Sequence, residues 1–413
     1  VTTIGQVVNV RRGASPRPIQ DPRWFAPRGP GWVRIADVSR SFRVLKSTEQ
    51  YLSPEGVSKS VRLGPGDLVL SIAGTIGKPI ILGIDACIHD GFVYFPELAG
   101  SSLLTEFLYY FFQHKQAALA GQGQPGTQKN VNTSIIASMV LGLPPRDEQR
   151  KIAAILSSVD DAIEATQAVI DQLGVVKKAM MAELLTRGLP GRHTRFKQTE
   201  IGEVPEEWGT ASLGDLASVV TSGSRGWAQF YADQGALFLR ITTLERSTTR
   251  LDLTDRQHVR LPPGSAEGTR TRVAGGDVLI SITADLGIVG LVPIQGVGET
   301  YVNQHIALIR LDQRRADPSY MANVLVGNVG QSQIRRLNDA GAKAGLSLPS
   351  IRHLLVPLPP TDEQRSLAEP IDQAEGRLDA ERASLVALRR VKAALMSVLL
   401  TGEVRVKPDE EAA

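Results

Sequence analysis

The chain spells nearly the same phrase twice. The first copy, LPPRDEQRKIAAILSSVDDAI, covers residues 143–163, and the second, LPPTDEQRSLAEPIDQAEGRL, covers residues 358–378. Aligning Asp147 with Asp362 gives an offset of 215 (362 minus 147), which continues without a gap to Thr186. A period of this length lies far beyond the roughly 20–50 residues of a solenoid repeat. The chain is therefore predicted to be a tandem pair of similar halves.

A hydrophobic seam follows the repeated phrase in both halves. Apolar residues recur at alternating spacings of four and three for more than four heptads, which is the pattern of a coiled coil. About forty residues at about 1.5 Å each would make a helix of about 60 Å. Two helices of equal length with matching seams are expected to pair antiparallel, related by a pseudo-two-fold axis. The predicted seam residues are Ile152, Leu156, Val159, Ile163, Ile170, Leu173, Leu367, Ile371, Leu378, Leu385, Leu388 and Leu395.

Polar residues interrupt this seam at matched positions. Lys177 and Lys392 align across the two halves. We interpret them as long side chains that extend past the seam into solvent. The alternative is that polar residues in the seam control the register of the two helices.

The starts of the two helices carry capping signals. Thr361 and Gln364 form a capping-box pattern directly after two prolines, and Asp147 is the expected cap of the first helix. Pro370 lies inside the second helical pattern, so we expect it to kink that helix or to delay its start.

Each half also has a globular part, called a head below, in front of its helix. Short apolar runs bounded by glycine and proline, such as those at 67–74 and 277–284, are typical of strands, and helical patterns occur at 103–119 and 320–337. The sequence therefore predicts an α+β fold with two similar heads joined by two long helices. The expected boundaries are 1–142 for the first head, 143–190 for the first helical region, 191–357 for the second head with an N-terminal linker, 358–403 for the second helical region and 404–413 for a tail.

The composition narrows the class of protein. The 46 basic and 43 acidic residues leave a net charge of +3, which neither requires nor excludes a nucleic-acid partner. The single cysteine, Cys87, cannot form an intrachain disulfide and fits a reducing compartment. The sequence shows no leader-like segment and no apolar run of about 18 residues. We expect a cytoplasmic protein without a membrane span.

Motifs of catalysis and cofactor binding are missing from the sequence. It contains no P-loop, no dinucleotide-binding fingerprint and no H-E-x-x-H motif, and its six histidines include no pair at metal-ligand spacing. We expect a non-catalytic chain that binds no cofactor or metal of its own.

Basic and amide residues gather in the predicted loops of both heads. Such side chains can reach phosphates or base edges of DNA, although surface loops also carry them without any binding role. The set is more informative than its members, because the duplication keeps the loop positions while their letters differ. Two domains that recognise different DNA sequences would need such a shared scaffold with different loop residues. The candidate DNA-binding residues are Arg11, Arg12, Arg17, Arg23, Lys78, Gln128, Lys129, Asn130, Arg225, Trp227, Arg246, Gln304 and Lys343.

The helix-opening phrases resemble the L-P-P-x-x-E-Q pattern of one protein family, the specificity subunits of type I restriction-modification systems. The stretch GRHTRFKQTEIGEVPEEW at 191–208 resembles the linker and second-domain start of that family, and GDLVLSIAGTIG and NQHIALIR resemble its head domains. The resemblance covers essentially the whole chain. The first half begins without a counterpart of EVPEEW, so the edge of the first head is expected to differ from that of the second.

The resemblance implies a function and a set of partners. Two target-recognition domains would each read one half of a bipartite double-stranded DNA target, and the helices between them would pair antiparallel. The chain would assemble with two methyltransferase subunits and, for restriction, with two restriction and translocase subunits. S-adenosylmethionine, ATP and Mg²⁺ would belong to those partners. The DEQR segments at both helix starts, followed by equivalent outward faces of the helices, are expected to present two similar docking sites for the methyltransferases.

Two other functions fit parts of the pattern. A coiled-coil protein-interaction scaffold without DNA readout would show no salt-sensitive DNA binding. A nuclease with an unrecognised site would cleave DNA in the presence of Mg²⁺, but the sequence lacks a recognisable constellation of carboxylates and lysine for that chemistry.

Overall fold

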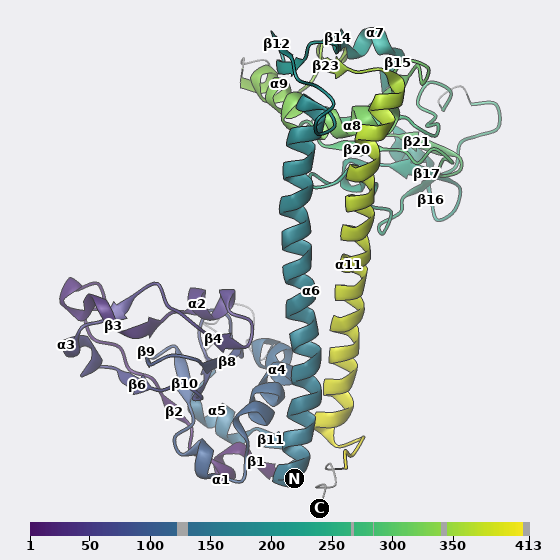
Figure 1. The fold of residues 1–413 in the computed structure, drawn as a ribbon. Helices are drawn as coiled ribbons and strands as arrows, with labels where there is room; N and C mark the ends of the chain where they lie inside the picture. Colours follow the sequence, from purple (N-terminus) through teal and green to yellow (C-terminus); the bar gives the residue numbers. More distant parts are fainter. Residues whose placement is uncertain (122–130, 266–267, 284, 340–344, 408–413) are drawn as a thin grey trace, which may run out of the picture. The chain divides into compact units, whose positions relative to one another are not determined.

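The structure is a computed structural model that divides into two compact units (Figure 1). One unit consists of residues 1–168 and 382–413, and the other of residues 169–381. Each unit contains one head together with one half of each long helix, α6 (Arg146–Arg187) and α11 (Thr361–Thr401). The residues described are 1–121, 131–265, 268–283, 285–339 and 345–407. Within these ranges, no helix combines the length and the apolar character that a membrane span requires.

The first head alternates short strands with short helices. Its elements are β1 (Thr2–Thr3), α1 (Ile4–Val7), β2 (Arg11–Arg12), η1 (Pro22–Trp24), β3 (Phe25–Val33), α2 (Ile35–Arg40), β4 (Val44–Leu45), β5 (Tyr51–Leu52), α3 (Pro54–Val57), β6 (Val61–Leu63), β7 (Leu68–Ser71), β8 (Pro79–Leu82), β9 (Ala86–Ile88), β10 (Phe92–Tyr94), η2 (Leu98–Gly100), α4 (Thr105–Gly121), α5 (Thr133–Ser138) and β11 (Val140–Leu141).

These elements form layers. A five-stranded sheet in the order β2-β10-β7-β8-β4 lies between a four-stranded sheet, β5-β3-β9-β6, and a layer of helices that includes α4 (Figure 1). Strand β7 contributes to both cores, because Val69 packs between the two sheets while Leu68 and Leu70 pack against the helices. A strand buried on both faces reads as a continuous apolar run, which explains the pattern at 67–74.

The second head has the same kinds of elements. They are β12 (Phe196–Thr199), β13 (Gly202–Pro205), β14 (Gly209–Ser212), α7 (Leu213–Leu216), β15 (Ala217–Ser222), η3 (Trp227–Phe230), β16 (Tyr231–Ala232), β17 (Ala236–Leu239), η4 (Ile241–Thr243), β18 (His258–Val259), β19 (Val278–Ser281), β20 (Val289–Leu291), β21 (Thr300–Val302), β22 (Ile306–Leu311), α8 (Pro318–Val326), α9 (Asn328–Asp339), α10 (Leu348–Arg352) and β23 (Leu355–Leu358).

The layers of the first head recur here. The sheet β15-β22-β19-β20 lies between the sheet β16-β18-β17-β21 and a helical layer with α8. In β19, Leu279 packs between the sheets while Val278 and Ile280 face the helices. Each outer sheet contains one parallel pair, β3 with β9 at the centre of the sheet in the first head and β17 with the edge strand β21 in the second. The α+β prediction is confirmed, and both heads share one architecture.

The long helices pair antiparallel within each unit. In the first unit Asp160 faces Lys392, and residues before Asp160 share a core with residues after Lys392. In the second unit Lys177 faces Glu375, and residues after Lys177 share a core with residues before Glu375. Of the predicted seam, the structure buries Ile152, Leu156, Ile163, Leu367, Ile371, Leu378 and Leu385 and half-buries Val159, Ile170, Leu173, Leu388 and Leu395.

The two seam lysines do not extend into solvent. Lys177 is 6 % exposed and Lys392 is 8 % exposed, and each forms an ion pair with a buried carboxylate of the other helix. Our interpretation of these lysines as snorkelling side chains is therefore wrong. The physical reason is that each ammonium finds a carboxylate inside the seam, so it does not need water to compensate its charge.

The helix starts also differ from the predictions. Helix α6 begins at Arg146, so Asp147 is not its cap. The Gln364 side chain does not cap Thr361, because it accepts a hydrogen bond from the Asp317 N–H (2.8 Å) and donates to the carbonyls of Arg315 and Pro359 (3.1 and 2.9 Å).

Gln149, the equivalent of Gln364, bonds the Leu104 N–H and the Ser102 and Pro144 carbonyls in the same way (each 2.9 Å). Each glutamine thus joins a helix start to the head of its own unit.

Pro370 lies inside α11, which begins at Thr361, so Pro370 does not delay the start of the helix.

Replacing Gln364 by Leu should destabilise the protein. The change leaves the Asp317 N–H and the carbonyls of Arg315 and Pro359 without their partner, which should lower the free energy of unfolding by about 1–3 kcal/mol. Chemical denaturation measures this change. The matched control is Gln373→Leu on an exposed position of the same helix, which should shift stability by less than about 0.5 kcal/mol. Equal effects of the two substitutions would contradict the assigned role of Gln364.

Candidate nucleic-acid interface

In both heads the chain leaves the inner sheet through a glycine. Gly13 follows β2 and donates its N–H to the Phe92 carbonyl (2.9 Å), and Gly223 follows β15 and donates to the Ile306 carbonyl (3.3 Å). A Cβ on Gly13 would lie 2.3 Å from the oxygen of His89, and one on Gly223 would lie 2.1 Å from the oxygen of Asn303. Only glycine allows this close approach. The loops after these glycines therefore start at equivalent points of the two heads.

The loop of the first head is organised around Asp90. Arg17 forms an ion pair with Asp90 (2.6 Å), Ser15 donates a hydrogen bond to the same carboxylate (2.7 Å), and Arg12 donates through Nε to the Asp90 carbonyl (2.5 Å). Burial alone would raise the pKa of Asp90, but the Ser15 hydroxyl and the charges of Arg17 and Arg12 outweigh it and lower the pKa. The contacts hold Arg12 and Arg17 side by side at the exposed surface.

The other two candidates of this loop have different surroundings. The Arg23 guanidinium lies 4.0 Å from the centre of the Trp24 ring and pairs with Asp21 (3.1 Å). Arg11 is exposed, and its side chain makes no hydrogen bond or ion pair to any residue that the structure describes. Arg11 is thus free to contact a ligand, whereas Arg23 would have to exchange existing contacts.

The short loop of the second head presents one free cation. Arg225 is exposed, and its side chain bonds no other residue within the described part of the chain. Trp227 is only 3 % exposed, stacks on Phe238 with 4.9 Å between ring centres and donates from its ring nitrogen to the Ser224 hydroxyl (3.0 Å). We therefore no longer count Trp227 among the candidate DNA contacts, because its side chain belongs to the core.

Three further candidates have polar partners inside their own heads. The Lys78 ammonium donates to the carbonyls of Ser39 (3.0 Å) and Ser41 (3.2 Å), and burial lowers its pKa. Arg246 pairs with Asp285 and donates to the Leu286 carbonyl (3.0 Å). The Gln304 amide lies 3.1 Å from the ring of His305.

The last four candidates, Gln128, Lys129, Asn130 and Lys343, lie outside the described residues.

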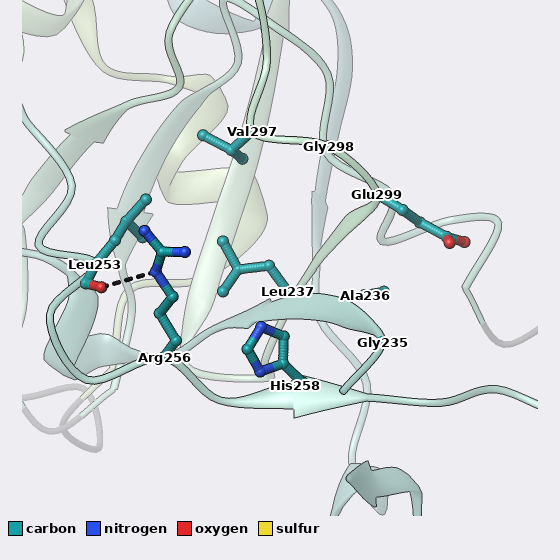
Figure 2. A pocket seen from close by; sticks show the side chains of 9 residues that line it. All are labelled: Gly235, Ala236, Leu237, Leu253, Arg256, His258, Val297, Gly298 and Glu299. Carbon is teal, nitrogen blue, oxygen red and sulfur yellow. Dashed lines mark hydrogen bonds between the residues drawn. The ribbon is translucent and has the colours of Figure 1, made fainter. Parts of the chain in front are cut away.

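A pocket in the second head brings together residues that the sequence analysis missed. Figure 2 shows Arg256 and His258 on one side of a pocket of about 510 Å³, with Leu237 and Val297 among its apolar walls. Arg256 donates through Nε to the Leu253 carbonyl (3.1 Å), and the ring of His258 makes no hydrogen bond to a described residue. A guanidinium and an imidazole above an apolar floor can contact phosphates or base edges. The stretch DRQHVR at 255–260 matches no motif, so only its basic character could have indicated this site.

The structure offers little for catalysis within its described part. No group of three or more histidine, cysteine, aspartate or glutamate side chains there could hold a metal ion. Cys87 is fully buried, and this burial raises the pKa of its thiol to about 11, which leaves the thiol unreactive at neutral pH.

The repeated DEQR segments do not form docking sites as a whole. Glu148 is 5 % exposed and binds Arg405 through two hydrogen bonds (2.7 and 2.6 Å). Its equivalent Glu363 is 1 % exposed and lies 2.7 Å from the ring nitrogen of His193. Together with the buried glutamines, these contacts make the centre of each motif internal, because each glutamate holds the segment that follows the other helix. Only the flanking residues, such as Asp147, reach the surface.

Both halves of the chain match one protein family. The family is described as the type I restriction modification DNA specificity domain, and it matches residues 1–174 and 205–389. The type I restriction enzyme MjaVIII specificity subunit of Methanocaldococcus jannaschii is 22 % identical over 358 residues, which cover 85 % of this chain and 82 % of that relative. The type I restriction enzyme EcoBI specificity subunit of Escherichia coli is 22 % identical over 382 residues, covering 89 % and 78 %.

Solved structures share the fold. The S subunit of a type I restriction-modification system from M. genitalium superimposes with a TM-score of 0.60 at 14 % identity and covers 96 % of this chain and 95 % of its own. A chain from a study of complex assembly and conformational transition of the type I R-M system reaches a TM-score of 0.55 at 16 % identity, covering 98 % and 97 %.

Substitutions at two neighbouring positions should separate core from surface. Trp227→Ala removes a buried ring and should lower the free energy of unfolding by about 3–5 kcal/mol. Arg225→Ala removes an exposed side chain without partners and should change it by less than about 0.5 kcal/mol. Denaturant titration of both variants measures the difference. A stable Trp227→Ala protein would show that the ring is not part of the core.

Proposed function

Because the chain belongs to the family of type I restriction-modification DNA specificity subunits, we propose that it directs such an enzyme to a bipartite double-stranded DNA target. It is a specificity subunit, and the catalytic activities lie in partner subunits. Each head reads one half of the target, and the paired helices keep the two half-sites at a fixed gap.

One observation carries the division of labour between the heads. The loops leave the two inner sheets at equivalent glycines, Gly13 and Gly223, but they differ in length and in residues. A shared scaffold with different contact residues supports two half-sites that are unrelated in sequence. Arg11 and the pair Arg12 and Arg17 are the candidates in the first head.

In the second head, Arg225 and the pocket with Arg256 and His258 are the candidates. Guanidinium groups that contact phosphates release counterions from DNA, so binding should weaken steeply as the salt concentration rises. Guanidinium groups that reach guanine edges add sequence preference.

The outward faces of the helices support two docking sites for methyltransferase subunits. Val176 and Val391 are equivalent under the duplication and are 42 % and 50 % exposed. Burying an exposed valine removes apolar surface from water, which is favourable in free energy. A matched pair of exposed valines on charged helices therefore favours contact with a partner. We place one methyltransferase at each, with two restriction subunits joining for cleavage. These partners bind S-adenosylmethionine, ATP and Mg²⁺, and the complex works in the cytoplasm.

A protein-interaction scaffold without DNA readout is not favoured. The family match covers both heads as well as parts of both helices, and the family is defined by DNA specificity. Methylome sequencing of cells that carry this subunit with its methyltransferase tests the proposed function. The expected result is a two-part methylated motif with a constant gap, and its absence in an active complex would refute the proposal.

Replacing Arg225 by Ala should affect only the half-site of the second head. If Arg225 reads a base, binding should weaken by about 1–3 kcal/mol and one position of that half-site should relax, whereas loss of a phosphate contact should reduce the salt slope by about one. Binding of the methyltransferase complex to duplexes over a salt series distinguishes the two. Arg314→Ala, in which an exposed arginine of the same head already pairs with Asp312, is the control and should bind normally. A change in both half-sites would contradict separate readers.

Native mass spectrometry should detect two methyltransferase subunits per chain. Val176→Asp and Val391→Asp should each reduce this number to one, because an aspartate cannot be buried in an apolar contact without a large desolvation cost. Ser384→Asp, at another exposed helix position, should still bind two. Saturation at a single copy with the unaltered chain would rule out the paired docking sites.

A further inference from the structure

Each unit buries one ammonium and one carboxylate at the contact of the two helices. Lys177 faces Glu375 in the second unit, and Asp160 faces Lys392 in the first, with all four residues at most 8 % exposed. In the second unit Lys177 neutralises Glu375 through one carboxylate oxygen, while the other oxygen of Glu375 has no hydrogen-bond partner within the described chain. A buried charge is tolerated only while its partner stays opposite to it.

The duplication relates the two pairs. Asp160 corresponds to Glu375 and Lys177 corresponds to Lys392 at the same offset of 215. Each helix therefore contributes its carboxylate to one unit and its ammonium to the other.

Sliding one helix along the other by a heptad would break the pairs. In the second unit the slide would bring Ala368 or Arg382 to the level of Lys177, and in the first unit it would bring Ala153 or Gln167 to the level of Lys392. None of these residues can neutralise a lysine. After the same slide, one apolar residue of the seam would still meet another apolar residue, whereas each lysine would lose its carboxylate. The ion pairs therefore discriminate between registers more sharply than the leucines do.

A loop of the second head contacts its ion pair directly. The Lys177 ammonium also donates to the Ser247 carbonyl (3.0 Å), and Arg250 pairs with Asp379 of α11 (3.0 Å). The head is thus attached to the helices at the point where their register is fixed.

The first head makes a similar attachment through Tyr110 of α4 and through the equivalent loop. The Tyr110 hydroxyl donates to Asp160 (2.8 Å), and the Lys392 ammonium lies 5.4 Å from the centre of the Tyr110 ring and 5.8 Å from that of Phe42. Arg43, next to Phe42, pairs with Asp161 on the surface of α6 (2.9 Å). The two loops are equivalent because both contain an Arg-Ser pair. Ser41 precedes Phe42 and Arg43 in the first head, and Ser247 lies in the loop that binds Lys177 in the second.

We propose that these two ion pairs are positioning elements that couple the place of each head on the helices to the helix register, and so restrict the complex to one gap length between half-sites. This inference rests on the proposed function. None of the four residues needs to contact DNA. They affect the length of the gap between the two half-sites and not the base sequence of either half-site.

The test uses the double variant Lys177→Met/Glu375→Leu in the full chain, assembled with its methyltransferase. This change keeps the volume and removes the charges, so the helices can still pack. Binding is measured on duplexes that carry both half-sites with gaps from two base pairs shorter to two base pairs longer than the natural one. The unaltered complex should prefer its own gap at least about tenfold over the neighbours, and the variant should prefer it by less than about threefold with unchanged half-site letters.

Two controls separate the outcomes. Lys178→Met, at the exposed neighbouring position, should keep the full preference. Glu375→Gln, which preserves shape, should give a partial loss and serves if the double variant does not fold. A folded variant of either kind with undiminished gap preference would overturn the inference. If the unaltered complex recognises no two-part site at all, the proposed function fails instead.

Discussion

A lysine buried in an apolar helix contact allows only one arrangement of the side chains around it. This constraint acts at two equivalent places, Lys177 and Lys392, and the rest of each unit is organised around it. The leucines and isoleucines of the seam supply the larger part of the hydrophobic stabilisation, but they accept several alignments. The ion pairs select one alignment, and the head loops attach where that selection is made.

The repeated helix-opening motif has an internal role that complements the seam. Gln149 and Gln364 join each helix start to the head of its own unit, while Glu148 and Glu363 hold the segment that follows the other helix. All four side chains are buried, so the motif is fixed by hydrogen bonding inside the protein. The loops beyond the sheets can then carry different contact residues while the scaffold stays intact.

Periodic features of the sequence predicted the large-scale fold correctly. The heptad spacing identified α6 and α11, and runs such as residues 68–71 and 278–281 identified strands that are buried on both faces. Features that depend on tertiary partners could not be predicted in this way. Gln364 matches a capping box, but three backbone groups of its own unit compete for its amide.

The candidate site was less predictable than the fold. Trp227 stands in a loop-like sequence, yet its ring fills the core beneath that loop, and Lys78 spends its donors on backbone carbonyls. Arg256 and His258 are only two residues apart, but the pocket beside them forms because residues 235–237 and 297–299, distant in sequence, supply its other walls. Exposure and pairing of single basic residues are decided by neighbours that are distant in sequence.

The glycine exits also bear on how such a protein can change over generations. Ten residues separate Gly13 from the buried Trp24, but only three separate Gly223 from the buried Trp227. Closing the longer loop costs only about 1 kcal/mol more in chain entropy, because this cost grows with the logarithm of length. Insertions and deletions between a fixed exit and a fixed anchor are therefore nearly neutral for folding. Descendants of such a protein can therefore acquire new DNA targets by altering loop length, without first passing through unstable intermediates.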